Sequence, residues 1–290
     1  MKIGLVGTGF WADRAHAAAI VARDDLEFVG VWGRDAAKAT ELARRDGAKA
    51  YETPDALFAD VDIVSFAVPP TVESELAPLA ADAGCHLLLE KPIATAVDSA
   101  QSVVDACGRN GVLSIVNFTN LVAGASGAWM RDGVIGRDWD GGEVTILGSL
   151  RSGADSPFLT PWRLRDDGAL WDVGPHAVSL LLAGLGPVAE VHSSHGRGDA
   201  IILLLEHERG AVSTVTLSYG LPAGSGKFSA GFWGGNGVTE APDADAGADS
   251  SFAASIAPSL DLLVGAIRSG QPLPWDAAFG AAVTGVLARA

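Results

Sequence analysis

Short apolar runs alternate with segments of helical periodicity over the first 117 residues. Apolar runs of about 4–8 residues are typical of buried strands, and apolar residues at every third or fourth position are typical of amphipathic helices. The predicted strands are 2–7, 27–33, 62–68, 86–89 and 112–117, and the predicted helices are 11–23, 36–46, 72–84 and 96–109. Strands that alternate with helices through short loops predict an α/β domain with a doubly wound parallel sheet.

The pattern changes after about residue 117. Longer alternating runs predict strands at 143–150, 188–194, 200–207 and 212–219, and helical patterns occur at 126–132, 171–182, 252–269 and 275–290. The last three strands follow one another through short turns, which predicts antiparallel pairing. We therefore predict two domains, an α/β domain over 1–118 and an α+β domain with a mainly antiparallel open sheet over 119–290.

The first predicted strand runs into a glycine-rich turn of the form GxGxxA. A strand before such a turn and a helix after it form the context of a dinucleotide-binding fingerprint. The first glycine permits the tight turn, the second lets a pyrophosphate approach the helix N-terminus, and the small third residue allows close packing. The predicted Rossmann cofactor contacts are Gly7, Thr8, Gly9, Phe10, Trp11 and Ala12.

The end of the second predicted strand indicates which dinucleotide binds. NAD enzymes usually carry an acidic residue there, which binds the ribose 2′-hydroxyl. This chain has Gly33 and Arg34 instead, and Lys38 follows on the next helix. Arginine can bind a 2′-phosphate through two hydrogen bonds, so we expect NADP(H) to be preferred over NAD(H). The alternative is that Arg34 is solvated and Asp35 takes the acidic role.

A charged pair, Glu90 and Lys91, follows the apolar run at 86–89, and Pro92 ends that strand because it has no N–H to donate. A lysine at the carboxyl end of a parallel strand points to where doubly wound folds bind ligands. A charged pair at this position loses hydration, which costs free energy. The pair therefore indicates a role in binding or catalysis. A solvated ion pair at a strand end is the alternative.

Asp172 and His176 form a second polar cluster in an otherwise apolar segment. Residues four positions apart lie on one face of a helix, so the predicted helix 171–182 places a carboxylate beside an imidazole. Such a pair can move the hydroxyl proton when a hydride leaves or joins an alcohol carbon. The alternative for Asp172 is an N-cap of the helix that holds His176.

Three motifs occur in order, namely Gly7-x-Gly9-x-x-Ala12, Glu90-Lys91-Pro92 and Asp172-x-Gly174-x-His176, with Pro69-Pro70 and Trp162-Arg163 in support. The chain resembles the glucose–fructose oxidoreductase and inositol dehydrogenase family (Gfo/Idh/MocA) over nearly its whole length. The resemblance implies NAD(P)-dependent hydride transfer to or from a sugar, cyclitol or related polyol or keto compound. It also implies an open sheet that flanks the active site and often mediates homo-oligomers such as dimers or tetramers.

The resemblance implies roles for individual residues, which we carry over as expectations. Lys91, Asp172 and His176 are the expected catalytic residues, with His176 or Lys91 handling the proton. Pro69, Glu90 and Lys91 are expected to contact the cofactor as well. The expected substrate contacts are Lys91, Asn117, Trp162, Arg163, Asp172 and His176. The chain departs from the family pattern at Asp166-Asp167-Gly168, where family members commonly have a run of glycines.

The 290-residue chain has a formal net charge of −15, which argues against nucleic acid and anionic membranes as partners. Two cysteines without metal spacing predict reduced, buried thiols and a cytoplasmic protein. His192, His195 and His207 lack an evident set of metal-ligand partners, so no metal is predicted.

Other functions explain the residues less well. A short-chain dehydrogenase requires a lysine four residues after a tyrosine, and neither Tyr51 nor Tyr219 has one. A methyltransferase does not account for Lys91 or for the Asp172–His176 pair. The alternative that stays open is a non-catalytic dinucleotide- or sugar-binding sensor on the same fold.

Overall fold

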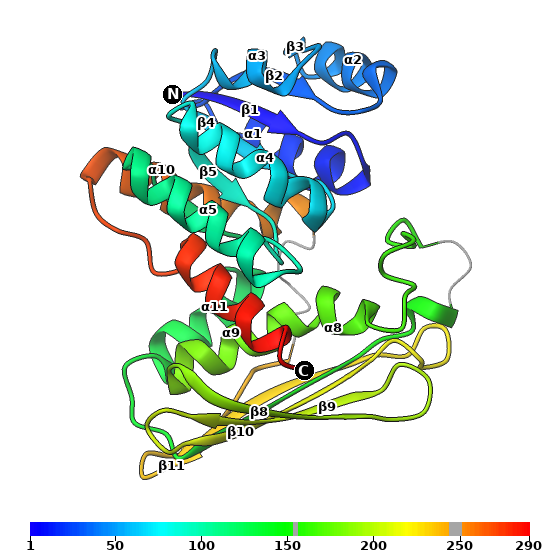
Figure 1. Ribbon diagram of the computed structural model, residues 1–290, viewed down its shortest axis with the longest axis vertical. Helices are drawn as coiled ribbons and strands as arrows, with labels where there is room; N and C mark the ends of the chain where they lie inside the picture. The colour runs from blue at the N-terminus through cyan, green and yellow to red at the C-terminus, as the bar shows by residue number, and fades with distance from the viewer. Residues whose placement is uncertain (153–155, 244–250) are drawn as a thin grey trace. The chain divides into compact units, whose positions relative to one another are not determined.

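A computed structural model describes residues 1–152, 156–243 and 251–290 of the chain (Figure 1). The chain divides into two compact units, Met1–Asn117 with Asp249–Ala281 and Phe118–Ala248 with Ala282–Ala290. The predicted boundary after residue 118 lies close to the first division. The predicted extent of the second domain, 119–290, differs from the structure because 249–281 cluster with the first unit.

The first unit contains a parallel sheet, as predicted, with six strands where the sequence predicted five. Its strands are β1 (Lys2–Val6), β2 (Glu27–Trp32), β3 (Lys49–Ala50), β4 (Ile63–Phe66), β5 (His86–Leu89) and β6 (Ser114–Val116). The strand order is β3-β2-β1-β4-β5-β6, so the order reverses between β1 and β4. Ligands of such Rossmann sheets bind outside the carboxyl ends of the strands at this switch point. The two-residue β3 is too short to give a pattern in the sequence.

Helices cover both faces of this sheet. They are η1 (Ala12–Ala17), α1 (Ala18–Val21), α2 (Ala36–Arg45), α3 (Pro54–Phe58), α4 (Pro70–Asp82), α5 (Val97–Asn110), η4 (Phe252–Ser255) and α10 (Ala257–Ser269). The predicted helix at 11–23 begins as the π-helix η1. Leu260 and Leu263 of α10 share a buried apolar cluster with Ile3 and Leu88 of the sheet. This packing explains why a segment so late in the sequence belongs to the first unit.

The second unit contains a mixed sheet in the order β12-β11-β7-β10-β9-β8. Its strands are β7 (Gly141–Leu147), β8 (Val188–His195), β9 (Ile201–His207), β10 (Val212–Ser218), β11 (Lys227–Gly234) and β12 (Gly237–Glu240). Every pair is antiparallel except β7 with β10. The predicted antiparallel run β8-β9-β10 is therefore confirmed.

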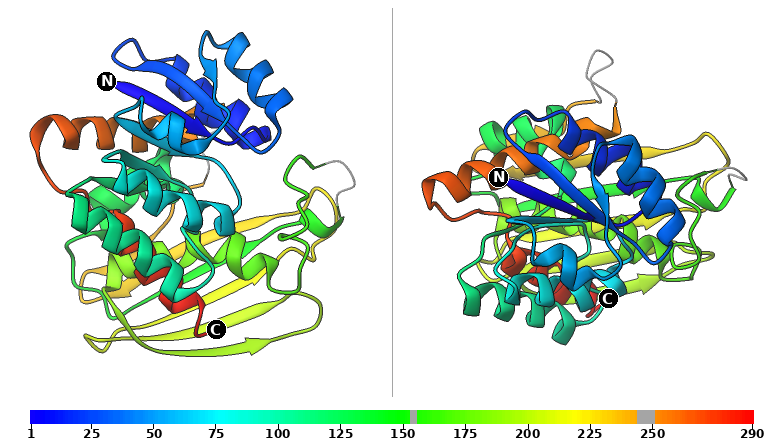
Figure 2. Two further views of the ribbon diagram at one scale, coloured as in Figure 1. Left: turned by 45° about the horizontal axis from the view of Figure 1, so that its top comes forward. Right: turned by 90° about the horizontal axis from the view of Figure 1, so that it is seen from above.

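Helices of the second unit lie on one face of that sheet (Figures 1 and 2). They are α6 (Thr119–Val122), α7 (Gly124–Trp129), η2 (Met130–Val134), η3 (Leu150–Ser152), α8 (Gly168–Asp172) and α9 (Gly174–Leu185), and α11 (Ala277–Leu287) begins in the first unit and ends in the second. Strand β9 alternates strictly between buried and exposed side chains, so one face of the sheet is solvated. Among the described residues, no helix has the length and apolarity to cross a bilayer.

Candidate active site

The glycine-rich turn follows β1 at the switch point of the parallel sheet. Gly7 has φ +136°, and a Cβ there would lie 2.4 Å from the Ala67 carbonyl oxygen, so only glycine fits. That Cβ would also lie 3.3 Å from the Cβ of Ala12, which shows why position 12 is small. A Cβ on the exposed Gly9 would meet nothing within 4 Å. The backbone at Gly9 is thus open to an approaching group, as a pyrophosphate site requires.

The side chains of the turn are held by neighbouring elements. A Cβ on Gly33, at the end of β2, would lie 2.6 Å from the Thr8 methyl group, so Gly33 is required by packing against Thr8. Phe10 packs edge-on against Phe252 of η4, with ring centroids 5.2 Å apart. The Trp11 indole N–H donates to Glu90 Oε1 at 3.0 Å. These contacts fix the turn to β5 and η4 and connect the cofactor motif to the lysine motif.

The charged residues that follow β2 differ in whether they have partners within the protein. Asp35 is the N-cap of α2, where its carboxylate accepts the Lys38 backbone N–H at 3.1 Å. The Lys38 Nζ lies 3.7 Å from the same carboxylate. Arg34 is exposed and forms no ion pair within the part of the chain that the structure describes. The guanidinium is thus available to an external anion, whereas Asp35 already has two partners.

Glu90 sits at the centre of a buried polar network at the ends of β5 and β6. Its Oε1 accepts from Trp11 and from the Asn117 side-chain amide at 2.9 Å, and it lies 3.2 Å from His16 Nε2. Ser259 of α10 in turn donates to Asn117 Oδ1 at 2.8 Å. The predicted residues Trp11, Glu90 and Asn117 are therefore brought together, and the half-buried Lys91 follows Glu90 directly.

The environment of Glu90 favours its ionised form. Burial opposes ionisation, but the His16 hydrogen bond, the charges of His16 and Lys91 and the Trp11 N–H outweigh it and lower the pKa of Glu90 to about 2. A carboxylate can only accept hydrogen bonds, so His16 Nε2 carries the hydrogen that points to it. The backbone N–H of Lys91 donates to Glu90 Oε2 at 3.3 Å. Glu90 is thus a fixed negative charge beside the lysine.

Several residues of this network were missed by sequence reasoning. His16 is fully buried in η1, and its Nδ1 lies 2.7 Å from Ser65 Oγ of β4. Glu73 of α4 is also buried and contacts the Glu90 backbone. A histidine within the alanine-rich run 15–19 and a glutamate in the first turn after Pro69-Pro70 are the signals that point to these positions. Neither signal alone distinguishes a buried polar residue from a solvated one.

In the second unit, Asp172 is held by two donors. The Arg163 Nε donates to Asp172 Oδ2 at 2.8 Å, and the Tyr219 hydroxyl donates to the same oxygen. Burial and the Asp172 charge raise the pKa of Tyr219 well above its usual range. Tyr219 is held from the other side by Asp199, which accepts its backbone N–H at 2.9 Å. Sequence reasoning predicted Arg163 and Asp172 and missed Tyr219, which directly follows the end of β10.

Asp172 and His176 do not share one continuous helix, so that prediction is wrong. Helix α8 ends at Asp172 and α9 begins at Gly174, with Val173 between them. Pro175 is the cause, because it has no N–H to donate to the preceding turn. The N-cap position of α9 is Val173, so the alternative role of Asp172 as an N-cap is also wrong. His176 lies half-buried in the first turn of α9.

The segment before α8 completes the surroundings of Asp172. The Arg163 guanidinium stacks over the Trp162 ring at 4.5 Å, so the two predicted substrate contacts lie together. A Cβ on Gly168 would lie 2.0 Å from the Arg163 carbonyl oxygen, which explains the glycine. Asp167 pairs with Arg165 at 2.9 Å on the surface. Position 168 is therefore a glycine because the backbone of Arg163 lies too close to it for any side chain.

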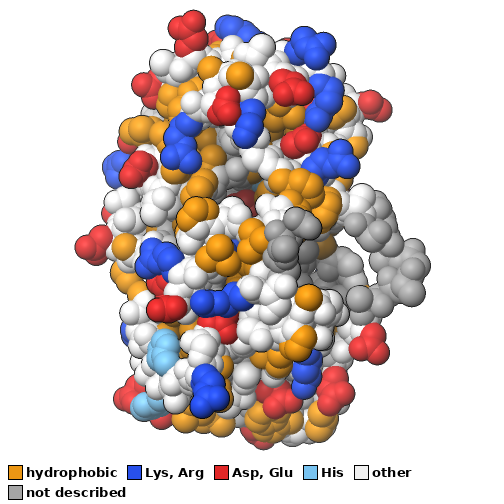
Figure 3. All heavy atoms as spheres, turned by 90° about the vertical axis from the view of Figure 1, so that its right-hand side faces the viewer, with side chains coloured by type: hydrophobic (Ala, Val, Ile, Leu, Met, Phe, Trp, Pro, Cys, Tyr) orange, Lys and Arg blue, Asp and Glu red, His pale blue; other side chains and the backbone are white. Residues whose placement is uncertain are grey.

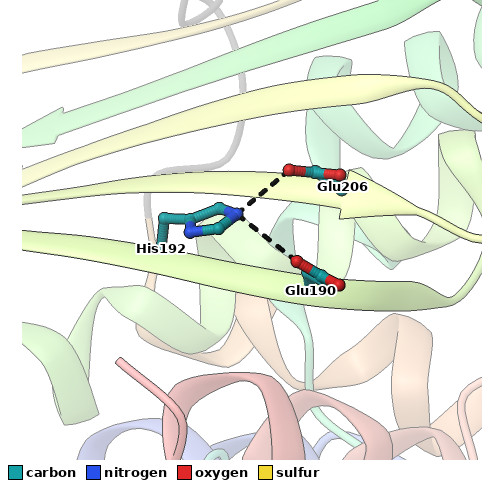
Figure 4. A group of neighbouring side chains, drawn as sticks. All are labelled: Glu190, His192 and Glu206. Atoms are coloured by element: carbon teal, nitrogen blue, oxygen red, sulfur yellow. Dashed lines mark hydrogen bonds and ion pairs between the residues drawn. The ribbon is translucent and has the colours of Figure 1, made fainter.

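The histidines of the mixed sheet have different environments. His207 is buried and satisfied, with Nδ1 2.8 Å from the Gly186 carbonyl and Nε2 2.9 Å from Ser213 Oγ. The expectation that His192 lacks ligand-type partners is wrong, because Glu190 and Glu206 lie beside it (Figure 4). Its Nε2 is 3.0 Å from Glu206 and 3.7 Å from Glu190. All three side chains are exposed, and the imidazole bridges two carboxylates that face each other across β8 and β9.

Charges of both signs are interspersed on the face of the molecule that Figure 3 shows. The net charge of −15 therefore forms no single acidic patch there. A hollow of about 700 Å³ in the second unit is lined by Arg137, Trp139, Leu185 and Arg209, among others. The predicted site residues do not line this hollow, so it is separate from the residues singled out by the sequence.

Comparison with known proteins fits the Rossmann unit and its glycine turn. The sequence model of an oxidoreductase family with an NAD-binding Rossmann fold (GFO_IDH_MocA) matches residues 1–118. This match covers the predicted Rossmann domain and includes the glycine turn and the Glu90-Lys91-Pro92 motif.

Individual relatives resemble larger parts of the chain. D-glucoside 3-dehydrogenase of Escherichia coli K12 is 28% identical over 205 residues, which are 67% of this chain and 57% of that protein. D-xylose 1-dehydrogenase (NADP(+)) 2 of Haloferax volcanii is 28% identical over 244 residues, 77% of this chain and 70% of that protein. A levoglucosan dehydrogenase solved with NADH and L-sorbose has a TM-score of 0.83 at 19% identity, covering 98% of this chain and 94% of that one. This structural similarity shows that the two proteins share a fold.

Proposed function

We propose that this protein is an NAD(P)-dependent oxidoreductase that transfers a hydride to or from a sugar, cyclitol or related polyol or keto compound. The observation that carries the proposal is the Glu90 network, which joins the glycine turn to the strand end that bears Lys91. Relatives named as dehydrogenases of D-glucosides and D-xylose support the class of substrate. A panel of sugars and polyols incubated with each cofactor tests it, read out as change in nicotinamide absorbance.

The residues of the first unit suit a dinucleotide. Gly7 permits the turn, Gly9 leaves its backbone open, and a helix follows the turn, which is the arrangement that a pyrophosphate site requires. Pro69, at the start of α4, lies at the other side of the switch point from Gly7. When bound, the nicotinamide supplies or accepts the hydride. If the protein binds cofactor but transfers no hydride to or from any sugar or polyol of the panel, a non-catalytic dinucleotide- or sugar-binding sensor is favoured instead.

We assign the proton step to Lys91 or His176. Lys91 is held beside the ionised Glu90, so its ammonium can donate a hydrogen bond to the reacting oxygen. Asp172 receives hydrogen bonds from Arg163 and Tyr219, which supports a role in orienting the substrate side through Arg163. Asn117, Trp162 and Arg163 complete the proposed substrate contacts.

The cofactor preference makes a separate prediction. We expect NADPH to give a lower KM than NADH, because the exposed Arg34 can pair with a 2′-phosphate while Asp35 is occupied as an N-cap. Arg34→Ala should raise KM for NADPH about 10-fold and leave KM for NADH unchanged, since a charge-assisted hydrogen bond contributes about 1.5–3 kcal/mol. Steady-state kinetics with both cofactors measure this. The matched control is Arg44→Ala, an exposed arginine near the end of α2. A preference for NADH that Arg34→Ala does not change would contradict the assignment.

We also propose that the protein is a homo-oligomer, a dimer or tetramer, through the open face of the mixed sheet. Ile202, Leu204, Val212 and Trp233 are exposed there, between 38% and 51%. Leu204→Lys should convert the assembly to monomers, because it places a charge among these apolar side chains. Light scattering after size exclusion measures the mass, and Leu79→Lys on the exposed face of α4 is the control. A monomeric mass for the wild-type protein would contradict this proposal.

A reducing compartment such as the cytoplasm suits the two cysteines. Cys85 and Cys107 are both free and buried. Burial raises the pKa of the Cys85 thiol to about 11, so it is held as an unreactive thiol. We therefore propose that the protein works where thiols stay reduced.

A further inference from the structure

A second acid lies against the Glu90 strand end, and the proposed reaction gives it no part. Glu73, in the first turn of α4, is 1% exposed, and its Oε2 accepts the Glu90 backbone N–H at 3.2 Å. Its Oε1 is buried without a hydrogen-bond partner among the described residues. Such a group in the interior needs an explanation, because a buried charge without a partner is costly.

The charged groups around Glu73 disfavour a second carboxylate. Glu90, directly after β5, is the charged group that acts on Glu73, and it is ionised. His16 of η1 is directed to Glu90, and no lysine, arginine or histidine within the described ranges forms an ion pair with Glu73. The other charged groups on α4 and α5 are Glu75, Asp82, Asp98, Asp105 and Arg109, all exposed, and Arg109 pairs with Asp82 at 3.0 Å. Burial and the charge of Glu90 raise the pKa of Glu73 well above its usual range, and the backbone hydrogen bond only partly opposes them.

We propose that Glu73 acts as a neutral carboxylic acid and is a positioning residue for Lys91. Two consecutive backbone N–H groups are each held by a carboxyl group here. Glu73 Oε2 accepts the N–H of Glu90, and Glu90 Oε2 accepts the N–H of Lys91. A neutral Glu73 holds the first peptide without placing a second negative charge beside Glu90. The inference rests on the proposed function only where it assigns Lys91 to the reaction.

The protonation state of Glu73 has a consequence for stability against pH. A carboxyl group whose pKa is raised on folding favours the folded state at low pH, where both states are protonated. This contribution is lost as the pH rises from the unfolded value of about 4.5 through the raised folded value. Glu73→Gln cannot ionise, so we expect it to abolish this loss. The free energy of unfolding of the variant should therefore exceed that of the wild type by an amount that increases from about pH 5 into the alkaline range.

The isosteric variant Glu73→Gln tests whether Glu73 is protonated or ionised in the folded protein. We expect Glu73→Gln to keep the cofactor Kd and kcat of the wild type at pH 7 and to raise the urea midpoint. Glu73→Ala should lower kcat about 10-fold with the cofactor Kd unchanged, because it removes the acceptor that holds the Glu90–Lys91 segment. The infrared difference spectrum, wild type minus Glu73→Gln, should contain the carbonyl band of a protonated carboxylic acid at pH 7. Glu75→Gln, an exposed neighbour on α4, is the control and should give no such band.

Opposite results would overturn the inference. An ionised Glu73 would give a carboxylate band instead, and Glu73→Gln would then weaken the protein at pH 7. A kcat for Glu73→Ala equal to that of the wild type would remove the positioning role. If no variant transfers hydride, the proposed function fails, but the infrared and pH–stability measurements still decide the state of Glu73.

Discussion

Lys91→Ala is expected to lower kcat for hydride transfer by about 10²–10⁴-fold, the range typical of a lost general acid or base. The cofactor Kd should change little, since contacts made mainly in the transition state affect turnover and not ground-state binding. Lys91 lies two residues after β5 and is held through its backbone by Glu90, so removing its ammonium leaves the network in place. Stopped-flow turnover and a fluorescence titration of the cofactor measure the two quantities.

The controls for Lys91 separate charge from proton transfer. Lys2→Ala removes an exposed lysine of the same unit and should leave turnover unchanged. The pH profiles of Lys91→Arg and His176→Ala distinguish the two candidates, because loss of the acid/base removes one limb of the profile. Nearly normal turnover in Lys91→Ala would refute its place in the reaction.

Glu90→Ala is expected to lower the free energy of unfolding by about 3–5 kcal/mol, as removing one partner of a buried ion pair typically does. The substitution leaves the buried donors of Trp11, His16 and Asn117 without their common acceptor. Urea unfolding followed by circular dichroism at neutral pH measures the change. A loss below about 1 kcal/mol, the level of a surface pair, would show that the network is not coupled to folding.

The pH dependence of that loss gives a second test of Glu90. A pKa that folding lowers from 4.5 to about 2 stabilises the folded state above pH 4.5, and this stabilisation is lost as the pH falls toward 2. The difference in stability between wild type and Glu90→Ala should therefore shrink by about 3 kcal/mol over this window. Glu75→Ala is the matched control, since that glutamate is exposed on α4. A difference that stays constant from pH 5 to pH 2 would contradict an ionised Glu90.

The sequence predicted best those features that depend on local patterns. The apolar run before Glu90 and the proline after Lys91 define a strand end without tertiary information, and the glycine turn after β1 is equally local. Residues 252–269 show a helical pattern, but their attachment to the first unit depends on which apolar face finds which partner. Hence the helices could be predicted, whereas the extent of the domains could not.

The polar contacts of the candidate site join residues that are far apart in the sequence, so local patterns do not predict them. His16 and Glu73 lie on helices 74 and 17 residues from Glu90, and their burial arises only when those helices pack beside β5. Tyr219, which donates to Asp172, lies 47 residues away along the chain, directly after β10. The predicted shared helix face of Asp172 and His176 failed for a local reason, because Pro175 interrupts the helical hydrogen bonds between them.

Transfer of a labelled hydride tests the central proposal most directly. The protein is incubated with nicotinamide cofactor deuterated at the transferring carbon and with a panel of keto sugars and keto cyclitols, and the products are examined by mass spectrometry. We expect deuterium on a carbinol carbon of at least one product, and loss of that label in Lys91→Ala. Tight cofactor binding with no deuterium in any product across the panel would contradict it.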